Sequence, residues 1–359
     1  MNFYKKSVKN ILLSIGISLL LYATLIFVID PIQQYRKASF YKPMFTNQRY
    51  LNPGLVKTYD YDTVIIGASE TENFNPIYID KQLNVKTLKL SIEGSNVFEN
   101  ELMLETAITT GKVKNVIYSI DTFAFHQESA SLKYSKLPLY LYDESILNDY
   151  KYLLNIDIFK KYLIKIILGN VFNKKKFTQP IEKFQYWGDK FQTRKQKLLI
   201  ETDKLLSKHE IPNYDKEYYT NMINLFDTQM LTNIKNNKDI NYYFIFPPYL
   251  INFWIPTEKN HVHENIDFKK YIVTKLLKLQ NVKIYDFQDV EDIVYDFSNY
   301  QGITHYKPSI NNYMIDSIRE NKHRLDSTNR IDIFYKSLID KNLIENILRR
   351  INQNDRIYK

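Results

Sequence analysis

The chain has 359 residues, 44% of them hydrophobic, so it can build one large domain or two ordinary ones around a substantial core. It contains no cysteine, which excludes a disulfide framework, a thiolate metal site and a cysteine nucleophile. The net charge of +9 favours anionic surroundings such as lipid headgroups or acidic polymers, or else reflects a lysine-rich solvated surface.

The first predicted element is a transmembrane helix over residues 10–29. Residues 11–28 include no charged side chain and are long enough to cross a bilayer. Lysines precede this run and Asp30 follows it, so the positive-inside rule places residues 1–9 in the cytoplasm and the main domain outside the cell membrane. A cleaved signal peptide is the alternative, but the run is long and no A-x-A-like site follows it. We expect an uncleaved single-pass anchor.

An α/β domain is predicted after a proline-containing juxtamembrane stalk at residues 30–59. The domain covers residues 60–325 and alternates strands with helices. Strands are expected at 62–69, 85–91, 114–121, 240–249 and 282–287, and helices at 76–83, 96–110, 268–279 and after residue 306. This alternation predicts a parallel sheet with right-handed crossovers.

The strand pattern is interrupted between about residues 130 and 238. Segments rich in Lys, Leu and Asn predict helices there at 145–167, 191–208 and 217–236. We interpret this region as a helical insertion rather than an independent domain. Residues 326–359 are expected to contain a C-terminal amphipathic helix, whose apolar positions recur every four residues and predict packing on the domain.

Ser69 is the first candidate for chemistry, because it follows the first strand in the stretch DTVIIGASETENF. Open parallel sheets bind ligands at the carboxyl ends of their strands. Ser69 could instead cap a helix, since Glu72 three residues later completes a capping-box pattern. The stretch is not a G-x-S-x-G elbow, because Thr71 occupies the position of the second glycine.

His305 is the candidate partner of Ser69. A serine hydroxyl is a weak nucleophile at neutral pH unless a general base such as imidazole lies within hydrogen-bond reach. His305 stands in Thr304-His305-Tyr306, close to the start of a predicted helix. Alone it would be an ordinary surface or capping histidine; together with Ser69 it favours a serine-dependent reaction.

Four segments together resemble the SGNH/GDSL hydrolase superfamily, and in particular its membrane-anchored bacterial branch, similar to teichoic-acid D-alanyl transfer proteins and polysaccharide O-acetylation proteins. They are VIIGASETENF (64–74), LSIEGS (90–95), FPPY (246–249) and NYQGITHY (299–306). The resemblance covers about residues 10–320, apart from the insertion. It implies a flavodoxin-like three-layer sheet and an acyl transferase or esterase without a cofactor.

The same resemblance implies partners and residue roles. The implied substrate is a cell-surface polysaccharide or teichoic acid that gains or loses an acetyl or D-alanyl group, beside a multipass membrane acyltransferase. Ser69 is the implied nucleophile and His305 the base. The backbone N–H groups of Ser69 and Gly94 are the implied oxyanion donors. Nucleic acid is not an expected partner, because no nucleic-acid-binding motif is recognisable.

One position departs from the superfamily pattern D-x-x-H, in which the Asp orients the histidine. The residue three before His305 is Gly302, which has no side chain. Three explanations remain: a Ser-His dyad supported by a backbone carbonyl, a carboxylate recruited from elsewhere such as Asp296, or weakened or lost activity. The last would make the chain a non-catalytic partner or scaffold of a membrane acyltransferase or polymer-export system.

Other residues are weaker candidates. Asp121 stands where many superfamily members place an oxyanion-donating Asn, and is expected to be structural because a carboxylate repels an oxyanion. Tyr249 and Trp254 could line an acyl or sugar pocket or simply pack the loop. His261 and His263 have spacing that could share a metal but lie in a polar loop, so no metal site is expected. His126 is expected to be a structural histidine.

Overall fold

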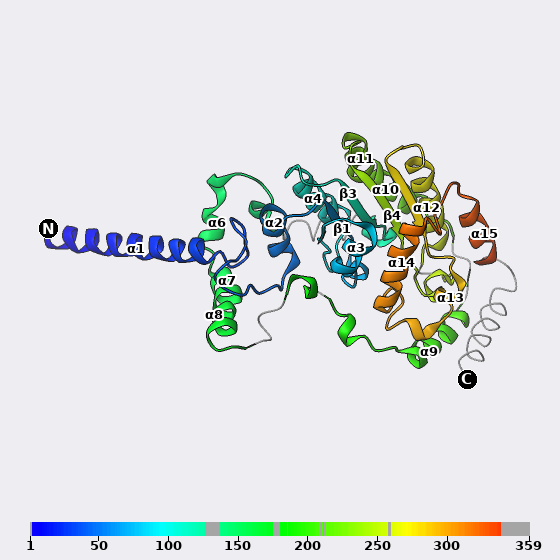
Figure 1. Ribbon diagram of the computed structural model, residues 1–359, viewed down its shortest axis with the longest axis horizontal. Helices are drawn as coiled ribbons and strands as arrows, with labels where there is room; N and C mark the ends of the chain where they lie inside the picture. Colours follow the sequence, from blue (N-terminus) through cyan, green and yellow to red (C-terminus); the bar gives the residue numbers. More distant parts are fainter. Residues whose placement is uncertain are drawn as a thin grey trace. The chain divides into compact units, whose positions relative to one another are not determined.

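A computed structural model describes residues 2–125, 137–174, 180–184, 186–208, 210, 213–257 and 260–338 (Figure 1). The chain divides into two compact units, each built from two separate stretches of sequence. The first unit takes residues 1–60 and 137–185, and the second takes residues 61–136 and 186–359.

The first unit begins with α1 (Asn2–Ile29), the expected apolar helix. Its residues Phe3–Ile29 are long and apolar enough to cross a membrane, and only 6% of its apolar window is buried within the protein. A core helix of a soluble domain would be mostly buried, so the exposure of α1 fits a membrane anchor.

A buried aspartate closes the turn that follows α1. Asp30 has a φ of 48°, and its carboxylate accepts hydrogen bonds from the backbone N–H groups of Gln34, Tyr35 and Arg36 at 2.8 to 2.9 Å. The hydroxyl of Tyr152 donates to the same carboxylate at 2.8 Å. These bonds join the end of α1 to a segment more than a hundred residues further along the chain.

The region expected as a stalk contains α2 (Gln48–Thr58). Pro53 and Gly54 lie inside this helix. Because proline normally interrupts a helix, the sequence does not predict one here. The first part of the expected insertion folds with it: the Lys57 ammonium donates to the carbonyl oxygen of Leu141 at 2.9 Å. This part forms α6 (Tyr150–Leu153), α7 (Ile156–Ile158), a π-helical segment (Phe159–Leu163) and α8 (Ile164–Val171). The insertion is therefore divided between the two units.

The second unit is an α/β fold around a five-stranded, all-parallel sheet, as the sequence predicts. Its strands are β1 (Thr63–Ile66), β2 (Thr87–Lys89), β3 (Asn115–Ser119), β4 (Asn241–Phe246) and β5 (Val282–Asp286). Their order across the sheet is β2-β1-β3-β4-β5, so the order reverses between β1 and β3. Ligands of doubly wound folds bind outside the carboxyl ends of the strands at this kind of reversal.

Helices accompany the strands close to their expected positions. They are α3 (Pro76–Leu83), α4 (Val97–Ile108), α9 (Lys195–Leu206), α10 (Lys216–Leu225), α11 (Thr232–Asn236), α12 (Val262–Leu276), α13 (Glu291–Val294), α14 (Pro308–Glu320) and α15 (Asn329–Leu338). Helix α3 contacts α14, and helix α10 contacts α12 (Figure 1). The expected C-terminal helix is seen as α15; its continuation lies outside the described residues.

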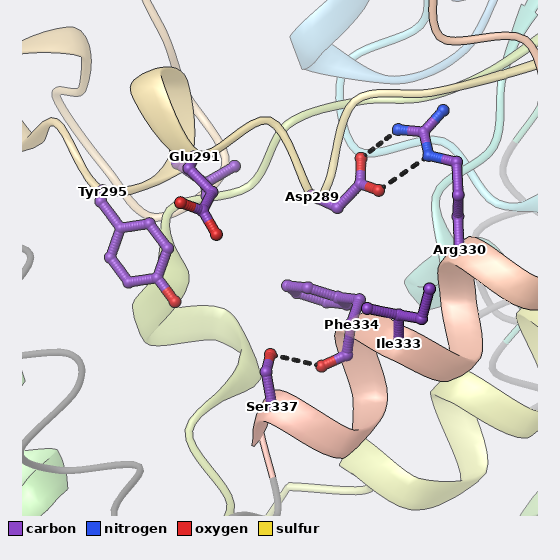
Figure 2. A pocket seen from close by; sticks show the side chains of 8 residues that line it. Asp289, Glu291, Tyr295, Arg330, Ile333, Phe334 and Ser337 are labelled. Atoms are coloured by element: carbon purple, nitrogen blue, oxygen red, sulfur yellow. Dashed lines mark hydrogen bonds and ion pairs between the residues drawn. The ribbon is translucent and has the colours of Figure 1, made fainter.

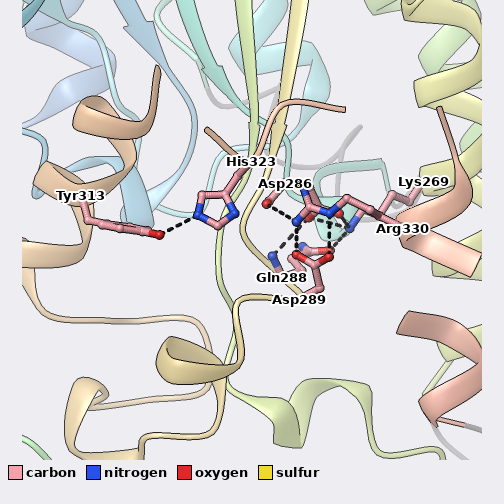
Figure 3. Close-up of polar contacts among 7 residues, drawn as sticks. All are labelled: Lys269, Asp286, Gln288, Asp289, Tyr313, His323 and Arg330. Carbon is pink, nitrogen blue, oxygen red and sulfur yellow. Dashed lines mark hydrogen bonds and ion pairs between the residues drawn. The ribbon is translucent and has the colours of Figure 1, made fainter. Parts of the chain in front are cut away.

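A buried ionic cluster fixes the end of β5 to α12 (Figure 3). The ammonium of Lys269 lies 2.8 and 2.7 Å from the two carboxylate oxygens of Asp286 and 2.8 Å from Oε1 of Gln288. Burial lowers the pKa of Lys269, and the charge of Asp286 opposes this shift. Arg330 of α15 pairs with Asp289 beside this cluster.

Candidate active site

A close turn at Gly67 places Ser69 at the end of β1. Gly67 has a φ of 151°, and a β-carbon on it would lie 2.5 Å from Cγ2 of Thr71 and 3.0 Å from Cβ of Ser119. Only glycine fits this backbone conformation and this close approach to two side chains. A short 3₁₀ helix, Ser69–Thr71, begins immediately after the turn.

The structure brings Ser69 and His305 together. Oγ of Ser69 lies 2.8 Å from Nε2 of His305, across 236 residues of sequence. Ser69 is not a helix cap, because the capping position belongs to Ala68 and no side chain caps this helix. An imidazole with its proton on Nδ1 accepts the hydroxyl proton of Ser69 in this arrangement. The capping interpretation of Ser69 is therefore wrong.

Trp187 covers the pair and was not identified from the sequence. Its indole Nε1 donates to the backbone oxygen of Ser69 at 3.3 Å, and its ring lies edge-on to that of His305 with centroids 5.5 Å apart. Gly188 allows this approach, because a β-carbon on it would lie 2.3 Å from Cγ of Pro308. In the sequence, Trp187 and Gly188 stand out only as a Trp-Gly pair in a polar stretch. No sequence pattern connects this pair to Ser69.

His305 is suited to act as a base at neutral pH. Burial lowers the pKa of His305 below its usual value, and the negative charge of Glu93 opposes part of that shift. The imidazole is consequently neutral under physiological conditions and has a lone pair for the serine proton. Glu93 belongs to the turn after β2, whereas Ser69 belongs to the turn after β1. The charge that acts on His305 therefore comes from a neighbouring turn.

The structure does not bring Asp296 to His305. Oδ1 of Asp296 accepts from the backbone N–H of Ser298 at 2.9 Å and from its hydroxyl at 2.6 Å, which caps a 3₁₀ helix. Within the described part of the chain, Asp296 makes no hydrogen bond to His305. Nδ1 of His305 makes no hydrogen bond to any described residue. The carboxylate whose charge acts on His305 is that of Glu93.

Gly94 lies in the turn that follows β2. Its φ of 57° is in the left-handed region that glycine favours. The turn is tied to the end of β1, because the N–H of Ile92 donates to the carbonyl oxygen of Gly67 at 3.0 Å. Ser69 is the first residue of its 3₁₀ helix, so its backbone N–H has no acceptor within that helix.

Two acids adjoin the turn that carries Ser69, the buried Glu70 and the partly buried Asp121. Oε1 of Glu70 accepts from the N–H of Ala68 at 3.2 Å. Burial raises the pKa of Glu70, and the charge of Asp121 raises it further; burial also raises the pKa of Asp121. The hydroxyl of Tyr249 lies beside Asp121. Asp121 and Glu70 thus form a pair of interacting acids at the ends of β1 and β3.

The structure places Tyr249 and Trp254 in the core. Each is only 1% exposed, which agrees with packing rather than with an open acyl or sugar pocket. Trp254 packs edge-on against Phe334, with ring centroids 5.7 Å apart. Phe334 belongs to the wall of a separate pocket of about 250 Å³, shown in Figure 2. That pocket is lined by Asp289, Glu291, Val294, Tyr295, Arg330, Ile333, Phe334 and Ser337.

The histidines with metal-like spacing have other contacts. The ring of His261 stacks on Tyr218 at 3.8 Å, and Nδ1 of His263 lies 2.5 Å from the hydroxyl of Tyr335. Among the residues that the structure describes, no three His, Asp or Glu side chains form a group that could hold a metal ion. His126 lies outside the described residues.

The described geometry supplies a hydroxyl and a neutral imidazole in hydrogen-bond contact at the reversal point of a parallel sheet. Such a pair can transfer a proton from the hydroxyl while the oxygen attacks an acyl carbon. Neither a protein-family model nor a curated protein sequence matches this chain.

Proposed function

We propose that the chain is a membrane-anchored acyl transferase or esterase that uses Ser69 as nucleophile and His305 as general base. The observation that carries the proposal is the 2.8 Å contact between Ser69 Oγ and His305 Nε2. The resemblance to the SGNH/GDSL superfamily supports the same two roles. In that superfamily the serine also follows the first strand and the histidine stands near the end of the domain.

The proposed reaction has two steps. Ser69 Oγ attacks the carbonyl carbon of an acyl donor while His305 takes the hydroxyl proton, and the backbone N–H groups of Ser69 and Gly94 receive the developing oxyanion. The leaving group accepts the proton from His305. A polymer hydroxyl or water then attacks the acyl-enzyme, and its proton returns through His305 to Ser69.

The proposed substrate is a cell-surface glycan or teichoic acid that gains or loses an acetyl or D-alanyl ester. The apolar helix α1 would keep the catalytic unit at the outer face of the cell membrane, where such polymers are modified. A multipass membrane acyltransferase is the proposed partner that delivers the acyl group. A freely secreted esterase is less compatible with a helix that is long enough to remain in the membrane.

A fluorophosphonate probe tests the nucleophile. The purified full-length chain should be labelled, and Ser69→Ala and His305→Ala should abolish labelling. Ser145→Ala and His323→Ala are matched controls, which remove the same groups elsewhere and should leave labelling unchanged. Absence of labelling, or labelling that survives in Ser69→Ala, would remove the catalytic proposal.

The second candidate function is a non-catalytic scaffold that binds the polymer or the membrane acyltransferase. It is favoured by one observation, namely that Gly302 stands where the orienting Asp of the superfamily is expected. An intact but unreactive Ser69–His305 pair, together with retained binding to the polymer by the unlabelled protein, would support this function instead.

A further inference from the structure

The first unit exposes many apolar side chains close to the end of the anchor helix. We name this set the collar. It consists of Ile146, Leu147, Tyr150, Leu154, Ile156, Ile164, Ile167, Val171 and Phe172, each at least 38% exposed. Single exposed apolar residues need no explanation, but a group concentrated in one short segment marks a surface that contacts something apolar.

Helix α8 shows that the apolar character of the collar is not a by-product of core packing. Its residue Ile166 is buried in the unit, whereas Ile164, Ile167 and Val171 are 38%, 43% and 70% exposed. The spacing of these three residues places them on one side of the helix. An amphipathic surface helix would carry polar residues on that side, so α8 has a second apolar face without a protein partner in the described unit.

The collar is attached to the anchor inside the apolar run of α1. The hydroxyl of Tyr22 donates to the backbone oxygen of Asn155 at 2.9 Å, and its ring lies 5.9 Å from that of Phe159. Tyr22 is about 10 Å from the C-terminal end of α1 along the helix axis. If α1 spans a bilayer, residues 155–159 therefore lie at the boundary between hydrocarbon and headgroups.

The direction and charge of the collar segment fit the same location. Figure 1 shows α7 and α8 extending across the direction of α1 at its C-terminal end. If α1 runs across a bilayer, helices in this orientation lie along the membrane surface. Lysines are interleaved with the apolar positions, at Lys151, Lys160 and Lys165, while Lys161 pairs with Asp157 of the same segment. Such side chains place their stems against acyl chains and their charges among anionic headgroups.

We propose that the collar is a membrane-interface surface, whose apolar side chains are buried among the lipids beside α1. This inference goes beyond the chemistry of Ser69 and rests on the anchoring part of the proposed function. Lipid is the occupant because the collar is bonded to a helix that is long and apolar enough to span a membrane and is hardly buried by protein. The anchor and the collar would hold the first unit against the bilayer at more than one point.

Single-cysteine reporters can test the collar, since the chain has no cysteine of its own. Full-length Leu147→Cys and Ile167→Cys would carry a nitroxide in vesicles of phosphatidylcholine and phosphatidylglycerol. Leu13→Cys in the apolar run of α1 is the lipid reference. Ile333→Cys in α15 is the matched control, an isoleucine 68% exposed in the other unit. Collision rates with oxygen and with a water-soluble nickel chelate are measured at each position.

We expect the two collar positions to resemble Leu13, with a ratio of oxygen to nickel collisions severalfold above that at Ile333. Collar positions that behave like Ile333 while Leu13 remains in lipid would overturn the proposal. Equal lipid contact at all four positions would also overturn it, as unspecific adsorption. Water contact at Leu13 itself would refute the anchoring. No other protein is present in these vesicles, so a protein partner cannot produce the expected signal.

Discussion

Gly302 lies beside Nδ1 of His305, the ring nitrogen to which no described residue forms a hydrogen bond. A β-carbon on Gly302 would be 3.5 Å from Nδ1 of His305, which is ordinary van der Waals distance, and φ at this position is outside the left-handed region. The site therefore has both the space and the backbone conformation for the side chain that the superfamily pattern places there.

Gly302→Asp should increase the reactivity of Ser69. A carboxylate at this position would accept from Nδ1 and stabilise the imidazolium that forms when His305 takes the serine proton. The gain should be about tenfold or more, since removal of the orienting Asp from trypsin costs about 10⁴ in turnover. The rate of fluorophosphonate labelling measures it. Gly302→Asn is the matched control without charge, and an Asp variant no faster than the Asn variant would contradict the prediction.

The labelling rate should fall with decreasing pH, with a midpoint below the usual pKa of histidine. Burial lowers the pKa of His305, and the base is lost only when the pH falls through that lowered value. Glu93→Gln removes a charge that raises the pKa of His305, so the midpoint should move further toward acid. Gly302→Asp should move it the opposite way.

Asp296→Asn serves as the control for these pH profiles, because Asp296 caps a 3₁₀ helix and does not bond to His305. Its midpoint should equal that of the wild type. The effect of Glu93→Gln should also shrink at high salt, since Glu93 is exposed and its charge is screened. A midpoint unaffected by Glu93→Gln at low salt would show that another group sets the pKa of His305.

The second unit should lose stability as the pH rises above the ordinary carboxylic pKa. Because burial and Asp121 raise the pKa of Glu70, the folded state keeps a proton that the unfolded state has released. The free energy of unfolding should drop by about 1.4 kcal/mol per pH unit for one such proton. Unfolding followed by tryptophan fluorescence reports on this unit, since both Trp187 and Trp254 belong to it.

Glu70→Gln removes one titrating group and should flatten this pH dependence. The amide retains an oxygen that can accept from the N–H of Ala68, so the turn before Ser69 should survive. An equally steep profile in Glu70→Gln would assign the pH dependence to other groups.

Lys269→Met should strongly destabilise the second unit. The ammonium is 2% exposed and pairs with Asp286, so its removal leaves a buried carboxylate without its counter-ion. Breaking such a pair costs about 3–5 kcal/mol. Chemical denaturation measures the loss, and Lys197→Met, which breaks the exposed pair with Glu201, is the matched control with little expected effect. Comparable losses of unfolding free energy in the two variants would show that the buried Lys269–Asp286 pair is no more important for stability than the exposed pair.

Local patterns were sufficient to predict much of the second unit. Each predicted strand contains an observed one, because the strand cores are short apolar runs between turn residues. In the structure Asn75 caps α3, and Asn96 caps α4 in a capping box with Glu99. The pairing of Ser69 with His305 followed from the order of motifs, which local propensity alone could not supply.

Contacts between distant segments were beyond prediction from one sequence. Trp187 lies on Ser69 although 118 residues separate them, and no repeated pattern links the two. The charge of Glu93 reaches His305 through the arrangement of two loops. Likewise, the expected stalk at residues 30–59 has aromatic residues that pack against residues 137–185, such as Phe45 against Phe184 and Tyr50 against Tyr162.

The first unit is built from two stretches of sequence that are separated by part of the second unit, and this sets the order in which its parts can fold. Bonds such as Tyr152 to Asp30 and Lys57 to Leu141 cannot form until residues 61–136, which carry β1 to β3 and Ser69, have been synthesised. Residues 30–60 therefore stay partly exposed during synthesis, while the sheet of the second unit begins to form. A soluble fragment cut before Tyr61 would also leave Leu141, Tyr152 and Tyr162 without the surface that buries them. Removing α1 by that route would damage a folding unit rather than release a domain.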